Sequence, residues 1–483
     1  MRTQIQAYFY TFVLVVGIAF PSWIHCDIYN KLLTFLTLDS IKATNGFDAS
    51  QYEETFDDDP TKLPWVKLLL QSYPELMWLA DKNVDVTQEG VPLHQENSWS
   101  FRLWGQHYPE FDRAVLSIWA LRAIDKGTPD AHRFFTQSQT GKEMLGYGEF
   151  IDLHIQLTQA LGKFPALKRN KILKCIETAL VLSDLGKTPI ARQKARAEGI
   201  TINHPQDFYR VTLSQCPSIF PTLSRLPFPY QEILIKSAAV ANFEHIRNLE
   251  GNPNVFKHFS ESKIESSIFN FAFFVNVCDT AARKGHIRID GCCNFDSFVN
   301  RTLQEVYSTC MQSAASSDHE RYIKYLTVRA KWLGLGTDTA QDRVLVRIGS
   351  MMGLSSLDHG RFLKKSFSKL DVRHQALILS QFDPREKDPL IRTPTYIPAI
   401  LKNMLQHRSL GHSFQERLDK TFILSLPFVA QVLKEHRQQL RESNENNYLP
   451  LNFNQIAKAI KNNPFALNYV QYELDADHHV IPY

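Results

Sequence analysis

The chain has 483 residues, of which 44% are hydrophobic and 22% are charged. These proportions are ordinary for a soluble globular protein and exclude collagenous, disordered and multi-span membrane classes, while the length predicts two or three domains. The 54 basic and 50 acidic residues leave a formal charge of +4. Such a balance gives no indication of nucleic-acid binding, which needs a concentrated basic face.

The N-terminus carries the clearest local signal. Arg2 is followed by a stretch without charged residues from Thr3 to Cys26, which contains an apolar run from Phe12 to Phe20. A short positive region before such a run predicts a signal peptide or membrane anchor over residues 1–26, and therefore an exported or membrane-anchored protein with possible membrane contact through this segment. The alternative is a buried first helix, in which case the protein is cytoplasmic.

Apolar residues recur every three to four positions along most of the remaining chain, which predicts a mainly α protein. We expect an N-terminal helical region over residues 27–148, a middle helical domain over 149–312 and a C-terminal helical region over 313–483. The predicted helices are Tyr108–Lys126, Phe150–Leu161, Leu167–Leu185, Tyr230–Leu249, Ser262–Ala282, Arg321–Leu333, Asp342–Leu354 and Pro427–Glu442. Pro427 suits the first position of the last of these helices.

An aspartate ends one of the most apolar of these helices. Asp184 follows Leu180-Val181-Leu182-Ser183 and shares a helical face with Leu180 and Val181. Burial of an unpaired carboxylate is costly, so a buried Asp184 needs a cation, a hydrogen-bond donor or a proton. Glu177 lies on the same stripe, which predicts that this face is partly wet.

Four further polar residues occupy comparable places in the middle domain. His154, His245 and Asp279 stand where the core-facing stripe of a predicted helix would otherwise be apolar, and His204 begins the segment His204-Pro205-Gln206-Asp207. Imidazole and carboxylate ligands together suit zinc, manganese or iron, and ligands from several helices of a bundle can converge on one ion. We therefore expect one divalent transition metal, bound by His154, Asp184, His245 and Asp279.

The stretch Leu182-Ser183-Asp184-Leu185-Gly186-Lys187 resembles the HD-x-G-K motif of the HD superfamily of metal-dependent phosphohydrolases. His154 and Asp279 match the first histidine and the final aspartate of that family. His204-Pro205 and the stretch from Asn242 to Pro253 resemble the histidine motifs of its HD-GYP branch. The resemblance covers about residues 149–285 and implies an HD-like helical bundle that hydrolyses a nucleotide or another phosphate ester.

Two departures bear on that activity. Ser183 replaces the histidine of the HD pair, and Asn252 replaces the tyrosine of the GYP triplet. Serine is a poor ligand for transition metals, so either one metal remains or the site is degenerate. In a live site the ion would activate a bound water, Lys187 would neutralise phosphate charge, and His204 would pass a proton to the leaving oxygen.

Two classes of function therefore stay open. The first is a metal-dependent phosphohydrolase acting on a phosphorylated small molecule or nucleotide. The second is a catalytically inactive helical interaction protein or secreted effector that keeps an HD-like core and binds a protein partner. Metal-dependent oxygenase chemistry, which some HD folds support, is a third hypothesis.

Two further histidine motifs lie in the predicted C-terminal helical region. Asp358-His359-Gly360 has no matching ligands elsewhere and is interpreted as a turn beside a basic face. His478-His479 near the C-terminus is a pair that a metal ion can use, although a solvated tail is the simpler interpretation.

Overall fold

The structure is a computed structural model of the full chain. It describes residues 55–84, 95–140, 143–165, 167–200, 205–240, 264–311, 317–384, 394–442, 451–468, 471–475 and 478–482. In these residues the protein is mainly helical, as the apolar periodicity predicts. The predicted signal or anchor segment, His204 and His245 lie outside the described residues. No helix within the described ranges has the length and apolar character needed to cross a membrane.

The first of two hydrophobic cores is built from helices that precede residue 330. Its long central helix α6, Pro109–Lys126, packs against α8, α9 and α16. One core therefore covers both sides of the predicted division between residues 148 and 149. The helices of this part are α4 Pro64–Ser72, η1 Pro74–Leu79, η2 Gln95–Asn97, α5 Trp99–Trp104, α6, α7 Pro129–Thr136, α8 Tyr147–Gly162, α9 Arg169–Ser183, η3 Leu185–Lys187, α10 Pro189–Ala197, α11 Pro205–Gln215, η4 Pro217–Ile219, α12 Pro221–Ser224, α13 Phe228–Ala238, α16 Ser266–Ala282 and α17 Ser297–Cys310.

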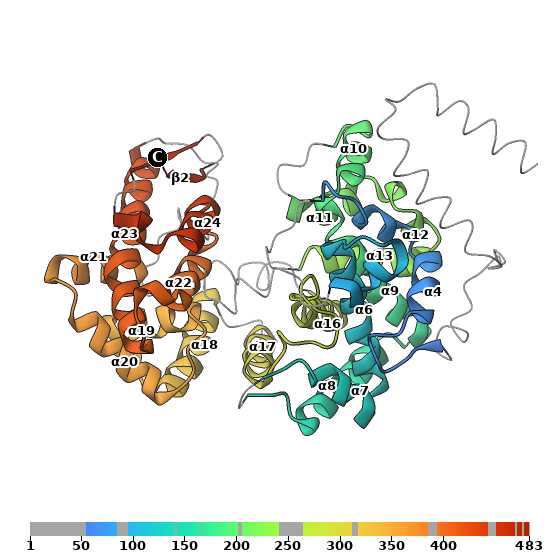
Figure 1. Ribbon diagram of the computed structural model, residues 1–483, viewed down its shortest axis with the longest axis horizontal. Helices are drawn as coiled ribbons and strands as arrows, with labels where there is room; N and C mark the ends of the chain where they lie inside the picture. Colours follow the sequence, from blue (N-terminus) through green and yellow to red (C-terminus); the bar gives the residue numbers. More distant parts are fainter. Residues whose placement is uncertain are drawn as a thin grey trace, which may run out of the picture.

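The second core occupies the C-terminal part of the chain, drawn in orange and red in Figure 1. Its helices pack mainly around the long helix α23, which contacts α20, α21 and α22. The elements are α18 Asp318–Leu333, α19 Ala340–Met351, α20 Leu357–Ser368, α21 Val372–Phe382, α22 Ile397–Gln406, η6 Arg408–Leu410, α23 Phe414–Glu442, α24 Asn454–Asn462, η7 Pro464–Asn468 and the antiparallel strands β1 Tyr472–Leu474 and β2 Val480–Pro482.

Helix α18 belongs to both cores. Tyr322, Tyr325 and Leu326 are buried in the first core, whereas Leu333 at the end of the same helix is buried in the second. Because α18 also packs on α17 and α19, it connects the two parts through side-chain packing as well as through the chain.

Six of the eight predicted helices are present with ends within a few residues of the expected ones. The helix predicted over Tyr230–Leu249 corresponds to α13, which ends at Ala238. Pro427 was expected to begin a helix and instead lies inside α23, a helix of 29 residues that begins at Phe414. That prediction is wrong because a proline inside a helix costs one backbone hydrogen bond and a clash, and burial of Leu418, Phe422 and Leu426 outweighs this cost.

The motif Asp358-His359-Gly360 is not a turn, as the sequence suggested, but the first turn of α20. Ser356 caps this helix by accepting a hydrogen bond from the backbone N–H of His359. A Cβ atom at Gly360 would lie 1.8 Å from the carbonyl oxygen of Leu333. Glycine is therefore required at this position by the close approach of α20 to the end of α18.

Candidate functional site

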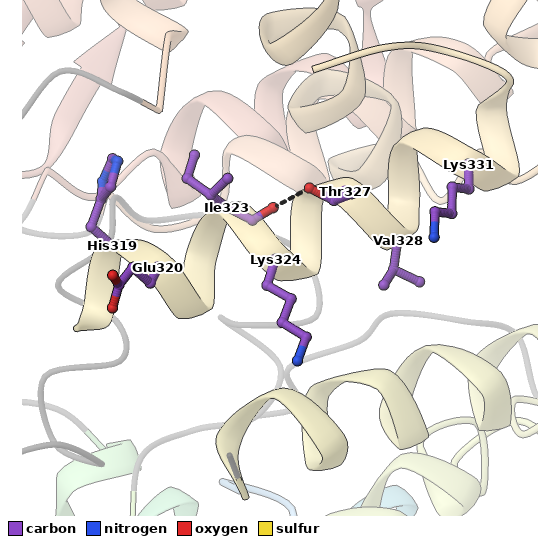
Figure 2. A pocket seen from close by; sticks show the side chains of 7 residues that line it. All are labelled: His319, Glu320, Ile323, Lys324, Thr327, Val328 and Lys331. Carbon is purple, nitrogen blue, oxygen red and sulfur yellow. Dashed lines mark hydrogen bonds between the residues drawn. The ribbon is translucent and has the colours of Figure 1, made fainter. Parts of the chain in front are cut away.

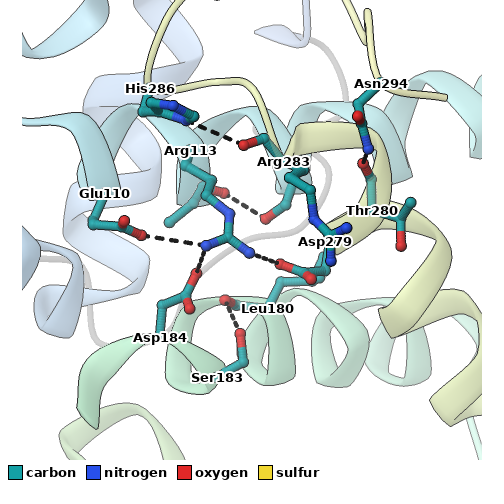
Figure 3. A network of polar contacts seen from close by, with 12 residues as sticks. Glu110, Arg113, Leu180, Ser183, Asp184, Asp279, Thr280, Arg283, His286 and Asn294 are labelled. Atoms are coloured by element: carbon teal, nitrogen blue, oxygen red, sulfur yellow. Dashed lines mark hydrogen bonds and ion pairs between the residues drawn. The ribbon is translucent and has the colours of Figure 1, made fainter. Parts of the chain in front are cut away.

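Two of the predicted metal ligands meet at an arginine that comes from outside the HD-like stretch. Arg113 lies near the start of α6, Asp184 caps the end of α9, and Asp279 lies in the last part of α16. Nη2 of Arg113 donates to Oδ1 of Asp279 at 2.7 Å, and Nη1 lies 3.4 Å from Oδ2 of Asp184. Figure 3 shows the guanidinium between the two carboxylates. The tertiary fold thus brings Asp184 and Asp279 together around a fixed cation.

Lys187 and Glu110 complete this cluster. The ammonium of Lys187 lies 2.7 Å from Oδ1 of Asp184 and donates to Oε2 of Glu110 at 2.8 Å. The same Oε2 atom is 3.4 Å from Nη1 of Arg113. Glu110, Arg113, Asp184, Lys187 and Asp279 are hereafter called the Arg113 cluster. Its carboxylates and cations contact one another directly, which compensates for their removal from water.

Electrostatics favour the ionised forms of these groups. Burial opposes the charge on Arg113, but Asp184, Asp279 and Glu110 outweigh it and raise the pKa of the guanidinium further above its ordinary value. Burial likewise opposes ionisation of Asp184, but the charges of Arg113 and Lys187 outweigh it and hold the pKa of this carboxyl well below its ordinary value. Arg113 and Asp184 are therefore both charged at physiological pH.

His154 lies elsewhere in the molecule. Its Nδ1 donates to the carbonyl oxygen of Ile124 at 2.9 Å, and a Cβ atom at Gly127 would lie 2.7 Å from its ring. Ile124 and Arg113 are 11 residues apart on α6, which at 1.5 Å per residue is about 17 Å. His154 therefore caps the far end of α6, where an imidazole N–H satisfies one of the last carbonyl groups.

Ser183, which replaces the motif histidine, also turns away from the cluster. Its Oγ donates to the carbonyl oxygen of Leu180 at 3.0 Å, within α9 (Figure 3). In the described part of the chain, no group of three or more His, Cys, Asp or Glu side chains is arranged to hold a metal ion. The donors at hand are carboxylates already paired with Arg113 and Lys187, so the described residues do not fit the expected metal.

The residues that sequence reasoning missed are Arg113 and Glu110, because both precede the HD-like stretch. One signal was available: Glu110 and Arg113 lie beside Phe111 and Ala114-Val115-Leu116 in the helix predicted from Tyr108 to Lys126. A charged residue within such apolar sequence needs a partner if it is buried.

The prediction that the Glu177 face is partly wet is wrong. Glu177 is fully buried in α9 and is paired with Nε of Arg122 from α6, and it also accepts a hydrogen bond from the hydroxyl of Tyr73. Burial is tolerated because the carboxylate finds a cation and a donor inside the core.

The cavities of the described structure lie away from these residues. One of about 580 Å³ runs along a face of α18 and is lined by Ile323, Lys324, Thr327 and neighbouring residues (Figure 2). Another of about 500 Å³ borders His436 on α23. Neither includes a member of the Arg113 cluster.

Comparisons with known proteins give one match. A model described as a family of unknown function (DUF6829) matches residues 66–469, which is most of the chain and includes both cores. No curated protein and no solved structure matches the sequence or the fold.

Proposed function

We propose that this chain, which belongs to a family of unknown function (DUF6829), is a helical interaction protein whose HD-like carboxylates hold the fold together. One observation supports this above all: the guanidinium of Arg113 lies between the carboxylates of Asp184 and Asp279. A guanidinium carries a permanent charge and presents donors in a rigid plane. Each carboxylate therefore already has the cation that its burial requires.

The nitrogen donors support the same interpretation. His154 donates to a backbone carbonyl at the other end of α6, and Ser183 bonds within its own helix. A catalytic metal needs several deprotonated protein ligands and an open position. The described residues offer three paired carboxylates at the cluster and place His154 away from it, so no reaction step through a metal is derived.

A protein partner is the class of ligand that we expect. The second part of the molecule exposes large apolar side chains, among them Leu357, Val372, Ile423 and Phe465. Exposed apolar side chains of this size are what protein partners bury. The formal charge of +4 and the balance of acidic and basic residues give no support for a nucleic acid as the ligand.

A metal-dependent phosphohydrolase is the second candidate, and a specific observation favours it. Asp184 and Asp279 contact the same side chain although 95 residues separate them in the sequence, and Lys187 lies beside them. This is the convergence that the HD resemblance implies. For a phosphorylated small molecule or nucleotide to be hydrolysed, His204 and His245 would have to supply the nitrogen ligands, and Arg113 would have to release the carboxylates.

Metal content separates the two candidates. The full chain, purified without a polyhistidine tag, is assayed by elemental analysis beside Asp184→Asn, and both are screened against phosphate monoesters and diesters. The matched control is Asp130→Asn, whose carboxylate is exposed and paired only with Arg133. We expect Asp184→Asn to carry as much metal as the parent, which means well below one equivalent at Asp184. We expect no turnover of a phosphate ester by either protein. Near-stoichiometric metal and turnover that are lost in Asp184→Asn but kept in Asp130→Asn would overturn the interaction proposal.

The binding half of the proposal has its own test. Proteins that co-purify with the chain are compared between the parent, Asp184→Asn and Phe465→Asp, all confirmed as folded by circular dichroism. We expect a partner that is retained by Asp184→Asn, since the cluster is internal, and weakened by a charge on the exposed apolar surface. Retention of every partner by a panel of such surface variants, together with measured turnover, would contradict the proposal.

A further inference from the structure

The two consecutive histidines near the C-terminus do not form a solvated tail. Nδ1 of His479 pairs with Oδ2 of Asp475 at 2.8 Å within the same hairpin. His478 instead faces α23, and its Nδ1 lies 3.1 Å from Nε2 of His436. The adjacent histidines are thus separated, and His478 forms a new pair with a histidine 42 residues earlier in the chain.

The backbone at His478 is held in an uncommon state. Its φ is 57°, in the left-handed region that residues other than glycine seldom adopt. Such a conformation persists only where the surrounding contacts compensate for it. The hydrogen bond to His436 is one of these contacts, and the bond from the N–H of Asn452 to the carbonyl oxygen of His478 at 3.0 Å is another.

We propose that His436 and His478 form a binding site for a divalent transition metal ion, with Zn²⁺ as the reference ion, which fastens the C-terminal hairpin to α23. Two imidazole nitrogens bound to one tetrahedral zinc at 2.0–2.1 Å lie about 3.3–3.4 Å apart. The observed 3.1 Å is short of this by only a few tenths of an ångström. Imidazole is also the side chain that suits zinc, copper and nickel.

The cavity beside His436 leaves room for water to complete a coordination sphere. The cavity of about 500 Å³ that borders His436 has Glu435, Tyr472 and Glu473 in its lining. Its two carboxylates favour a cation, and its volume accommodates metal-bound water. Glu435 accepts a hydrogen bond from the hydroxyl of Tyr472, so the wall next to His436 is already organised between α23 and β1. The site thus has two protein nitrogen ligands, with water in the remaining positions.

The ion would take the place of the proton that the two nitrogens now share. In the hydrogen bond, one imidazole donates its N–H and the other accepts through a lone pair. When Zn²⁺ binds, the donating imidazole changes tautomer: it loses this proton to solvent and takes one up on its other ring nitrogen, so both rings stay neutral and donate lone pairs to the metal, with no change in oxidation state. Binding in this way links α23 to the segment that leads into β2.

Zinc titration of the full chain tests the proposal. Isothermal calorimetry on tag-free, chelator-treated protein is expected to give one Zn²⁺ site at His436 and His478, and Co²⁺ at the same site is expected to give a visible absorption spectrum typical of tetrahedral nitrogen and oxygen coordination. His436→Gln keeps an amide nitrogen near the position of Nε2, and His478→Asn tolerates the left-handed backbone. Each variant is expected to bind zinc at least about tenfold more weakly.

Two matched controls locate the site. His479→Asn removes the neighbouring histidine, which is paired within the hairpin, and is expected to bind zinc as the parent does. Asp184→Asn removes one carboxylate of the Arg113 cluster and is also expected to leave this zinc site unchanged, so the result is independent of the proposed function. No zinc binding by the parent, or undiminished binding by the folded double variant His436→Gln/His478→Asn, would overturn the proposal.

Discussion

Helices α6 and α9 are joined by two arginine–carboxylate pairs that differ in how completely they are enclosed. Arg122 and Glu177 are both buried in the core, where Glu177 also accepts a hydrogen bond from the hydroxyl of Tyr73. Arg113 and Asp184 lie at the ends of the same helices, where Lys187, Glu110 and Asp279 join them and 28% of the Asp279 side chain is exposed. One pair is sealed, and the other is shared among several charges with access to water.

This difference in exposure determines whether a ligand can reach each pair and how the protein responds to the loss of one charge. A sealed pair has no room for a ligand, and loss of one partner leaves a bare charge in the core. In the shared cluster Arg113, Lys187, Asp184 and Glu110 each have more than one partner, so the removal of one charge is partly compensated by the others. If the molecule has any chemistry at these helices, it belongs to the shared cluster, because only that cluster is open to water.

Substitution of Arg122 is expected to have the largest effect. Arg122→Met leaves Glu177 buried without its cation, and breaking a buried pair in this way costs about 3–5 kcal/mol of unfolding free energy. Urea denaturation followed by tryptophan fluorescence measures it, and this signal reports the first core because no tryptophan follows Trp332 in the sequence. The double variant Arg122→Met/Glu177→Gln should recover much of the loss, and no recovery would mean that packing of the arginine chain dominates.

Arg113→Met is expected to cost less, about 2 kcal/mol, because Lys187 still neutralises Asp184 and Glu110, while Asp279 is partly solvated. The same fluorescence-detected urea unfolding measures it. A cost equal to that of Arg122→Met would contradict this ranking and show that the remaining charges of the cluster do not compensate for the loss of Arg113.

The pH dependence of stability provides a separate test at the end of α6 that carries Arg113. Burial and the nearby charges of Arg113, His107 and Lys187 lower the pKa of His286 to about 4, although its hydrogen bond to the carbonyl of Arg283 favours the charged form. The unfolded chain therefore binds a proton below about pH 6.5 that the folded chain takes up only near pH 4. Stability from this group is fully present above that range and falls with pH through it, on the order of 2 kcal/mol between pH 7.5 and pH 5.

The variant His286→Asn isolates this contribution. Asparagine places an amide donor near the position of Nδ1, which bonds to the carbonyl of Arg283 at 3.1 Å, and it does not titrate. Unfolding of the variant should depend less on pH between 7.5 and 5 than that of the parent. Identical slopes in the two proteins would assign the acid sensitivity to other groups.

The smallest effect is expected at the surface. Arg361 and Asp358 form an exposed pair in the first turns of α20, with 77% and 63% of their side chains accessible. Arg361→Met should change stability by less than about 0.5 kcal/mol, since solvent screens such pairs. Thermal unfolding monitored by circular dichroism checks it. A loss as large as that of Arg113→Met would mean that burial does not determine how much each ion pair contributes to the stability of the protein.

The helices were predictable from sequence because burial of one face imposes a period that the residues display. Helices α8, α18 and α19 follow this pattern, whereas α6 and α16 are buried over most of their surface. Where the prediction was wrong, at Pro427 and at Asp358-His359-Gly360, a local rule competed with packing. Proline and glycine usually end helices, yet here the second core keeps both residues within helices.

The candidate site was predictable only in part. Asp184, Asp279 and Lys187 could be singled out because each is polar next to apolar sequence, and the first two meet in the structure. Their partner Arg113 could not be assigned, because the amphipathic period of a helix says which face is buried but not which helix lies against it. His154 was singled out for the same reason as Asp184, but its partner is a backbone carbonyl. The pattern of side chains along the sequence cannot predict such a partner.

Helix α18 has a thermodynamic consequence for the whole molecule. Tyr322, Tyr325 and Leu326 are anchored in one core while Leu333, two turns beyond Leu326, is anchored in the other. Unfolding of either part therefore removes packing contacts from α18, a helix that also packs in the other part. Unfolding of the two halves is therefore expected to be cooperative at this helix.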